Sequence, residues 1–268
     1  MASFQTMSGG ALPAAMTLFV GNVLKAKIVP GTGELVPFEL SLDPPGSVSL
    51  QKNDPRPQPN FQLLELKATA AGVATLTAEN AKKAKAGPVE ITVKEKLELP
   101  SAITEEGALV RLLLAEAPSP FAAGYSALTA KSGMEWMELV ISNRLDLKSA
   151  QVGSAGAQTY FDVIKAPRQF EGFSGYPMLG AKQANNIQDI VDIANDGTHP
   201  KQKLFEAHVR AAIEVAGKGT VTDPCPTRLL GWRTAGASGP GGEFTLFRSF
   251  AGQDFYTIPA KKPAPKKK

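Results

Sequence analysis

The chain has 268 residues, of which 43% are apolar, and it contains one cysteine, Cys225. This length suits two small domains, and a single cysteine excludes both an intramolecular disulfide and a cysteine-rich metal motif. The net charge of +4 comes from the last eight residues, which hold five lysines. The rest of the chain is close to neutral, which argues against nucleic acid as a specific partner.

The N-terminal stretch offers no targeting segment. Its apolar run, Ala11–Val23, has no Lys or Arg before it and is shorter than the roughly 20 apolar residues of a membrane-spanning helix. We therefore expect no signal peptide, no membrane insertion and a flexible N-terminus over residues 1–14. A protein of this kind that acts outside its cell is exported without a signal peptide.

Polar and apolar residues alternate over residues 15–99, as in Phe38–Leu42, Gly72–Ala78 and Val89–Val93. This period of two is typical of half-buried strands. Proline-rich pieces, Asp43–Gly46 and Asn53–Pro59, are excluded from central strands because proline has no N–H to donate. The pattern predicts an antiparallel β-sandwich. Its segment Gly72–Asn80 resembles the "G.ATLTA" strand of bacterial immunoglobulin-like (Ig-like) modules, which implies an Ig-like sandwich that docks or binds.

Helical spacing begins after Pro100, where we place a domain boundary. Thr104 is the predicted N-cap of a first helix, with Glu105 and Glu106 in its first turn. Further helices are expected over residues 134–147, 187–195 and 203–216, and residues 244–256 predict a hairpin or closing strand. The predicted fold class is α+β with two domains: a sandwich (15–99), an α-rich domain (100–258) and a disordered basic tail (259–268).

The apolar stripe of the first helix ends in a carboxylate. Leu109, Leu112 and Leu113 follow helical spacing, and Glu116 is the next member of the series, two residues before Pro118. A carboxyl at the core's edge and at the negative end of a helix has a raised pKa, as an acid that protonates a glycosidic oxygen requires. The alternative is that Glu116 turns outward into solvent.

The landmarks after Leu109 resemble, in order, those of the SleB-type cell wall hydrolases and related muramidase domains. They are Leu109–Ala117, Val140–Arg144, Asp162–Phe170, Asp223-Pro224, Trp232 and Gly252–Tyr256. The resemblance implies a lysozyme-like domain, with Glu116 as the general acid and base that cleaves between N-acetylmuramic acid and N-acetylglucosamine, and no cofactor. Two positions depart from the family: Pro118-Ser119-Pro120 replaces its Arg-Gly-Glu, and Asp254 replaces its late histidine.

The resemblance and the helical pattern also suggest roles for other residues. Asn143 and Arg144 are interpreted as structural, with Arg144 paired to a carboxylate or to helix-end carbonyls. The substrate-binding candidates are Gln169, Phe170, Tyr176 and Tyr256, with Phe170 equally suited to the core.

A second carboxylate decides the mechanism. Retaining glycosidases hold two carboxyl groups about 5–5.5 Å apart, and inverting ones about 6.5–9.5 Å apart. The candidates are Glu135, Glu138, Glu171 and Asp254. If none lies near Glu116, a single Glu suffices for a lytic transglycosylase.

The remaining motifs predict little chemistry. His199 and His208 lack metal-ligand spacing, so no metal is expected and both are placed at the surface. The glycine-rich run Gly236–Gly242 is expected to be a mobile loop near the cleft.

We therefore expect an enzyme that degrades peptidoglycan glycan strands in the periplasm or cell wall of a target bacterium. It would be a secreted antibacterial effector, with an immunity protein and a secretion-system carrier as partners, or a phage-type lysin. The alternative is a non-catalytic wall-binding or adhesion protein with a degenerate hydrolase domain.

Overall fold

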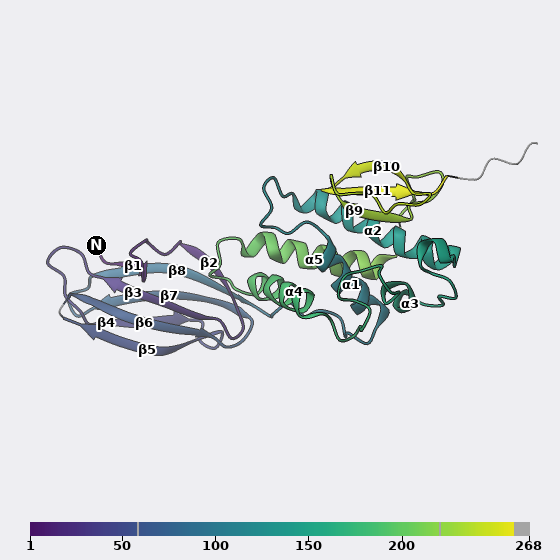
Figure 1. The fold of residues 1–268 in the computed structure, drawn as a ribbon. Helices are drawn as coiled ribbons and strands as arrows, with labels where there is room; N and C mark the ends of the chain where they lie inside the picture. The colour runs from purple at the N-terminus through teal and green to yellow at the C-terminus, as the bar shows by residue number, and fades with distance from the viewer. Residues whose placement is uncertain (58, 220, 260–268) are drawn as a thin grey trace, which may run out of the picture. The chain divides into compact units, whose positions relative to one another are not determined.

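The computed structural model describes residues 1–57, 59–219 and 221–259, which form two compact units. The N-terminal unit comprises Met1–Leu97 with Asn195–Gln202, and the C-terminal unit comprises Glu98–Ala194 with the chain from Lys203 onward. The fold is α+β: a mainly antiparallel β region precedes a region that contains the helices (Figure 1). The tail expected at 259–268 lies outside the described residues, apart from Pro259.

Two four-stranded sheets build the N-terminal unit. One has the order β1-β3-β6-β5 and is antiparallel throughout; the other has the order β2-β8-β7-β4, in which only β2 and β8 run parallel. The strands are β1 (Ser3–Thr6), β2 (Ala15–Phe19), β3 (Val23–Val29), β4 (Phe38–Asp43), β5 (Val48–Arg56), β6 (Phe61–Ala68), β7 (Gly72–Asn80) and β8 (Lys85–Lys94).

The predicted alternation is confirmed in these strands. In β7, Ala74, Leu76 and Ala78 are buried while the residues between them are partly exposed. A buried glutamine also joins the sheets: Gln62 on β6 accepts a hydrogen bond from the Phe38 N–H on β4 (2.7 Å) and donates one to the Phe38 carbonyl (2.8 Å). The amide thereby satisfies backbone groups at the end of β4 that have no ladder partner on that side.

One local expectation in this unit is wrong and another is confirmed. Residues 1–14 were expected to be flexible, but β1 pairs with β3 and buries Phe4. Four residues are too few to give a visible alternation. The proline-rich segment was expected to stay out of central strands, and this is confirmed: Asn53–Arg56 belongs to β5, which lies at a sheet edge, where proline is tolerated.

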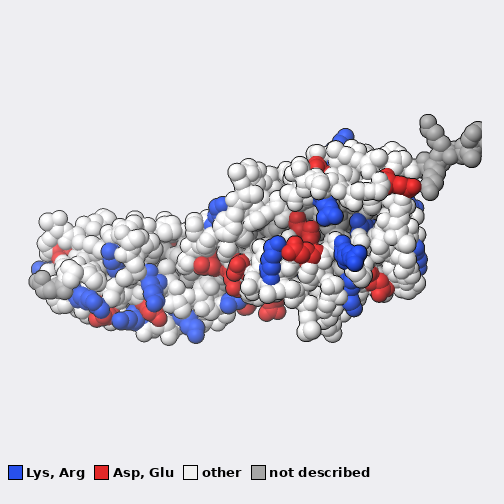
Figure 2. Space-filling model, in the orientation of Figure 1, with Lys and Arg blue, Asp and Glu red and all other residues white. Residues whose placement is uncertain are grey.

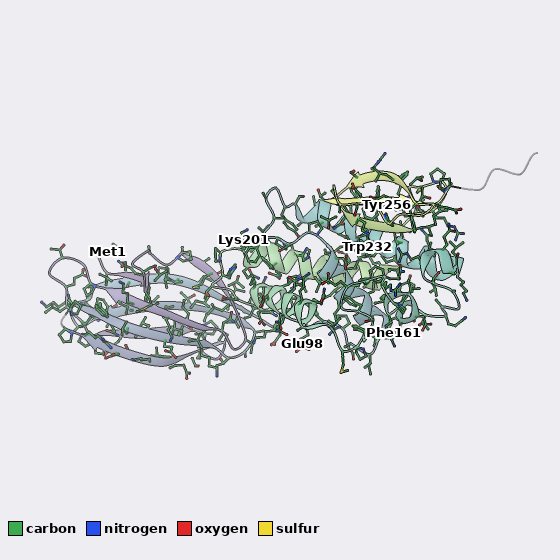
Figure 3. The ribbon with its side chains drawn as sticks, in the orientation of Figure 1. Met1, Glu98, Phe161, Lys201, Trp232 and Tyr256 are labelled. Atoms are coloured by element: carbon green, nitrogen blue, oxygen red, sulfur yellow. The ribbon has the colours of Figure 1, made fainter. Side chains whose placement is uncertain are left out.

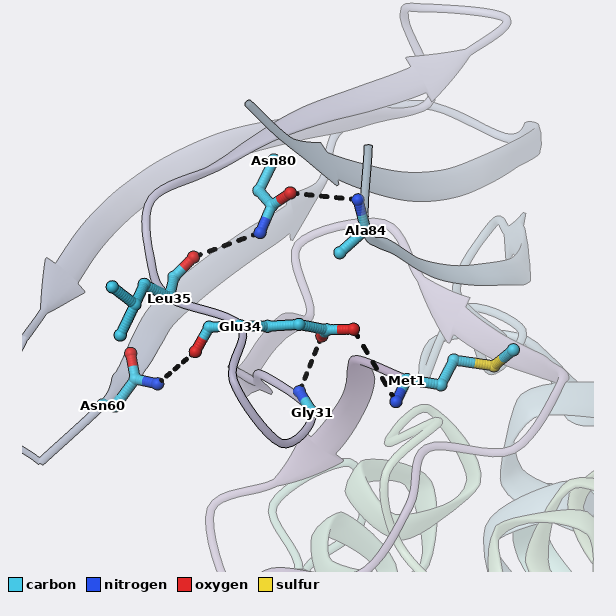
Figure 4. Close-up of polar contacts among 7 residues, drawn as sticks. All are labelled: Met1, Gly31, Glu34, Leu35, Asn60, Asn80 and Ala84. Atoms are coloured by element: carbon cyan, nitrogen blue, oxygen red, sulfur yellow. Dashed lines mark hydrogen bonds and ion pairs between the residues drawn. The ribbon is translucent and has the colours of Figure 1, made fainter. Parts of the chain in front are cut away.

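Polar side chains tie down the loop before β4 (Figure 4). The Glu34 carboxylate accepts from the Gly31 N–H (2.7 Å), and its backbone carbonyl accepts from the Asn60 side chain (2.9 Å). Asn80 donates to the Leu35 carbonyl and accepts from the Ala84 N–H, at 3.2 and 3.0 Å. The loop is therefore held by contacts with residues far along the chain.

Three α-helices of the C-terminal unit begin at residues that cap them. Thr104 accepts from the Gly107 N–H, as predicted, and Ser126 accepts from the Thr129 N–H. Thr159 and Asp162 form a capping box. The predicted helices are confirmed but longer, and α3 was not predicted. Their bounds are α1 (Glu105–Glu116), α2 (Ala127–Leu147), the 3-10 turn η1 (Ala150–Val152), α3 (Tyr160–Ile164), α4 (Ala181–Ala194) and α5 (Gln202–Lys218).

The chain ends in a three-stranded antiparallel sheet of order β10-β11-β9, which contains the predicted hairpin. Its strands are β9 (Gly231–Thr234), β10 (Thr245–Phe250) and β11 (Gln253–Thr257). Figure 1 shows this sheet beside α2. Trp136 of α2 packs against Phe247, Phe250 and Phe255, with ring centroids 4.5 to 6.1 Å apart. Aromatic packing therefore fixes the sheet on α2.

Candidate active site

Glu116 is the last residue of α1, and the C-terminal sheet holds it from one side. The helix ends there because Pro118 follows closely and cannot continue it. Gln253 of β11 donates to the Glu116 carbonyl (3.0 Å), and Trp232 of β9 donates from Nε1 to the Glu116 carboxylate (3.4 Å). Figure 3 labels Trp232 and Tyr256 on this sheet. The helix end and the sheet therefore place the carboxyl together.

The environment raises the pKa of Glu116. Burial is the largest cause, because it penalises the charged carboxylate, and the nearby charge of Glu171 acts in the same direction. The hydrogen bond from Trp232 and the charges of Arg233 and Lys182 act against it. The net direction is the one a general acid near neutral pH needs.

Glu116 lies on the wall of a cavity of 420 Å³, which we call the Glu116 cavity. Such a volume is in the range typical of sites for small ligands, about 300–1,000 Å³. Its wall comes from α1, α2, η1, the loop after α3, β9 and the glycine-rich loop. The lining residues are Glu116, Arg144, Gln151, Arg168, Gln169, Phe170, Glu171, Trp232, Arg233, Thr234, Pro240 and Phe244.

Aromatic and guanidinium planes form one side of this cavity. Phe170 stacks on Trp232 with ring centroids 5.2 Å apart and planes at 28°, and the Arg144 guanidinium lies 5.6 Å from the Phe170 centroid. Arg144 donates to the Leu230 carbonyl and to the Gln169 side chain, both at 2.8 Å. These contacts hold the stack in place beside Glu116.

The Gln169 side chain packs closely against the backbone at the end of η1, because the residue there is a glycine. Gly153 ends η1 with φ +69°, and a Cβ there would lie 2.5 Å from the Gln169 side-chain nitrogen. Glycine therefore serves both the left-handed turn and the close contact. Gln169 and Phe170 both line the Glu116 cavity, as expected of binding candidates, although Gln169 Oε1 accepts from Arg144.

One candidate second carboxylate shares the cavity with Glu116. Glu171 lines it, is exposed, and pairs with Lys182 at 3.2 Å. Glu135 does not line the cavity. Glu138 does not line it either: it is 2% exposed and accepts from the Tyr160 hydroxyl (2.9 Å). Among the described residues, Glu171 is therefore the one candidate second carboxylate that lines the same cavity as Glu116.

Asp254 has a structural role instead. It is buried on β11, where it accepts from the Ser249 hydroxyl (2.5 Å) and the Gly236 N–H (3.0 Å). These donors lower the pKa of its carboxyl. Asp254 therefore anchors the start of the glycine-rich loop, and its expected role as a second carboxylate at the cavity is wrong.

The two tyrosines proposed as substrate-binding residues do not line the cavity. Tyr176 is 2% exposed, stacks on Phe173 and packs at a tilt against Phe161, with ring centroids 6.0 and 5.9 Å away. Tyr256 is buried on β11 against Gly239. Both belong to the packed interior, because an aromatic ring near a motif fills a core as readily as it lines a cleft.

Asn143 and Arg144 have structural contacts, but the partners of Arg144 differ from those expected. Asn143 donates to Asp223 (2.7 Å) and to the Leu229 carbonyl (2.9 Å). Arg144 contacts an amide and a carbonyl ahead of β9 rather than a carboxylate or a helix end. Burial lowers its pKa to about 10. Both residues fix the chain that leads into β9.

The histidines differ in burial. His208 of α5 is fully buried, not at the surface as expected, and its Nδ1 is 3.0 Å from the Tyr125 hydroxyl. Desolvation lowers its pKa to about 4. The lack of metal-ligand spacing misplaced it, because a neutral imidazole also packs in a core when one ring nitrogen has a partner. In the described part of the chain no three His, Cys, Asp or Glu side chains are grouped to hold a metal ion.

Sequence reasoning missed several cavity residues, chiefly Arg168, Arg233 and Thr234. Trp232 was noted only as a landmark. The glycine-rich loop was placed correctly near the cleft, since Pro240 lines the cavity. One signal was available for Trp232: indole is the donor most suited to a carboxylate at an apolar edge. Nothing local to Arg168 or Arg233 distinguishes them from surface arginines.

No protein-family model matches the sequence, and no curated protein matches it. Within the described residues, no helix combines the length and the apolar character needed to cross a membrane.

Proposed function

We propose that the protein cleaves the bond between N-acetylmuramic acid and N-acetylglucosamine in peptidoglycan strands, with Glu116 as general acid and base. One observation carries the proposal: a carboxyl with a raised pKa lies at the wall of a 420 Å³ cavity beside an aromatic stack. Aromatic faces pack on sugar rings, and a protonated carboxyl donates to the leaving glycosidic oxygen.

The arrangement supports a two-step role for Glu116. Its protonated carboxyl gives a proton to the oxygen of the breaking bond, so the sugar leaves as an alcohol. The carboxylate then accepts a proton from the attacking hydroxyl group, which belongs either to water or to C6 of the muramic acid itself. The first attack is hydrolysis and the second is transglycosylation.

Glu171 distinguishes these chemistries. It lies at the same cavity and its charge acts on Glu116, which favours a two-carboxylate hydrolase. However, it is exposed and paired with Lys182, which favours a spectator role and a transglycosylase. We propose the transglycosylase, because a carboxylate held in solvent by a lysine is poorly placed to stabilise an oxocarbenium-like centre.

The strand order supports an Ig-like assignment for the N-terminal unit. With strands numbered along the chain, the spatial order is β1-β3-β6-β5 in one sheet and β4-β7-β8 in the other, with β2 added beside β8. Ig domains pack a sheet of their first, second, fifth and fourth strands against a sheet of their third, sixth and seventh. Counting β1 and β2 as the two halves of the first strand gives this pattern. We propose a lysozyme-like role for the C-terminal unit on the basis of its helix-borne acid.

The test is digestion of purified peptidoglycan by the wild type, Glu116→Gln and Glu171→Gln, with the soluble products resolved by mass spectrometry. Glu135→Gln is the control, because this acid does not line the Glu116 cavity. We expect products with 1,6-anhydro ends, lighter by one water than reducing ends, from all but Glu116→Gln. Reducing ends together with loss of activity in Glu171→Gln would indicate a hydrolase. If the wild type releases nothing, the proposal is wrong and a wall-binding protein is the better account.

We further propose the setting that such an activity implies. The enzyme would act on the wall of a target bacterium as a secreted effector or phage-type lysin, and its producer would carry an immunity protein. Toxicity on directed expression in the periplasm, abolished by Glu116→Gln, tests this setting.

A further inference from the structure

Three arginines line the Glu116 cavity, and among the described residues none of them forms an ion pair with an acidic side chain within 4 Å. They are Arg144, Arg168 and Arg233. In the described part of the chain, the arginines that form ion pairs within 4 Å are others: Arg56, Arg210 and Arg228. Glu171 at the same cavity pairs with Lys182. Figure 2 shows acidic and basic side chains gathered on the visible face of the C-terminal unit.

Two of these arginines are held in energetically unfavourable states. Arg144 is 7% exposed, and the positive charge of Arg233 adds to burial in lowering its pKa. Arg168 has φ +65°, a left-handed conformation that residues other than glycine rarely adopt. Such conformations persist where the surroundings impose them and cluster at functional sites. The wall thus carries three guanidinium groups against two carboxyls, Glu116 and Glu171, and an anionic ligand would balance this excess of positive charge.

We propose that this cavity binds a saccharide carrying a carboxylate beside the scissile bond, namely a denuded glycan strand whose N-acetylmuramic acid ends in a free lactyl group. The inference rests on the proposed function and names its substrate class. Guanidinium groups present paired donors that match a carboxylate, whereas a neutral sugar needs none. In peptide-bearing strands the same lactyl group is an amide and carries no charge.

The geometry favours the lactyl carboxylate over those of the stem peptide. The lactyl group is attached to the sugar ring that Glu116 would act on, and the arginines line the same 420 Å³ cavity as Glu116. Carboxylates of a stem peptide are separated from that ring by further residues. A reaction that hydrolyses the amide between the lactyl group and the first amino acid must therefore supply this substrate.

A bound carboxylate would also act on the catalytic acid. Arg233 lowers the pKa of Glu116, and an anion between them opposes this effect. The substrate would thus keep Glu116 protonated until the glycosidic oxygen takes the proton. A neutral substrate lacks this effect.

The experiment compares three substrates made from one glycan preparation. They are peptide-bearing strands, amidase-treated strands with free lactyl carboxylates, and the treated strands with each carboxylate converted to a methyl amide. Rates are measured at equal strand concentration for the wild type, Arg168→Gln, Arg233→Gln and the control Arg248→Gln. Arg248 is exposed on β10 over Phe247 and does not line the cavity. Arg144 is left intact, because its guanidinium holds the chain before β9.

We expect kcat/KM for the free-carboxylate strands to exceed that for the other two at least about ten-fold, which corresponds to about 1.4 kcal/mol. Arg168→Gln and Arg233→Gln should reduce this preference, and Arg248→Gln should keep it. Equal rates on all three substrates would overturn the inference and leave the proposed function intact. A preference that survives in both cavity variants would also overturn it. Failure to cut any substrate would refute the proposed function itself.

Discussion

Trp232 donates a hydrogen bond from its indole Nε1 to Oε2 of Glu116 over 3.4 Å, and the two residues are 116 positions apart in the chain. Burial raises the pKa of the Glu116 carboxyl, and this hydrogen bond lowers it. The same indole stacks on Phe170, so one side chain both tunes the acid and forms the wall beside it. The properties of Glu116 therefore depend on β9 as much as on its own helix.

Replacing Trp232 with Phe tests this relationship. The ring keeps its stacking partner, but the donor is lost, so the pKa of Glu116 should rise. A general acid works in its protonated form, so the alkaline limb of the kcat/KM profile on peptidoglycan should move to higher pH. Trp136→Phe, which removes an indole from α2 outside the cavity, should leave the limb in place. A limb that moves equally in both variants would contradict a specific role for Trp232.

Glu116→Gln should stabilise the fold at neutral pH. The folded pKa of Glu116 lies above its ordinary value of 4.5, so the folded state favours the protonated acid. The stability that comes from the protonated Glu116 side chain is fully present below about pH 4.5, and it is lost as the pH rises through the folded pKa. The Gln variant does not titrate at this position, so it does not lose stability in this way. Urea unfolding should show it more stable than the wild type at pH 7 and no more stable at pH 4; an equal difference at both pH values would be inconsistent with a titrating Glu116.

His208 should make the fold sensitive to acid. Its folded pKa of about 4 lies below the ordinary value of 6.5, so the unfolded chain takes up the proton first. Stability is therefore lost as pH falls from 6.5 to about 4, by about 3 kcal/mol in total. His208→Gln keeps an acceptor for Tyr125 and should flatten this slope in urea unfolding, whereas His199→Gln should not. A slope unchanged in His208→Gln would mean that the buried imidazole is not its source.

Asn143 and Asp223 should be coupled energetically. Asp223 accepts from Asn143 and from the N–H groups of Cys225 and Leu229, all at 2.7 to 3.0 Å. Asn143→Ala should cost about 1–3 kcal/mol of stability, because it leaves buried groups without partners. A double-mutant cycle with Asp223→Ala should give an interaction energy above about 0.5 kcal/mol. Exposed Asn186→Ala on α4 is the control. Additive effects of Asn143→Ala and Asp223→Ala would refute the coupling.

The sequence alone determined the features that depend on local chemistry. The period of two marked the strands of the N-terminal unit, and Thr104, with Glu105 and Glu106, marked the start of α1. The end of that helix, and the position of Glu116 on its apolar stripe, followed from side-chain spacing and from Pro118. Each of these signals lies within a few residues of the feature it predicts.

Only the tertiary structure decided what surrounds Glu116. Arg168 and Arg233 line the cavity although nothing in their local sequence indicates it, and Asp254 and Tyr256 lie outside the cavity although they belong to the motif Gly252–Tyr256. The pairing of β9 with β11 and their packing on α2 decide which side chains face the acid. A carboxyl's chemistry depends on burial and on charges brought from distant positions, and local periodicity contains no information about either.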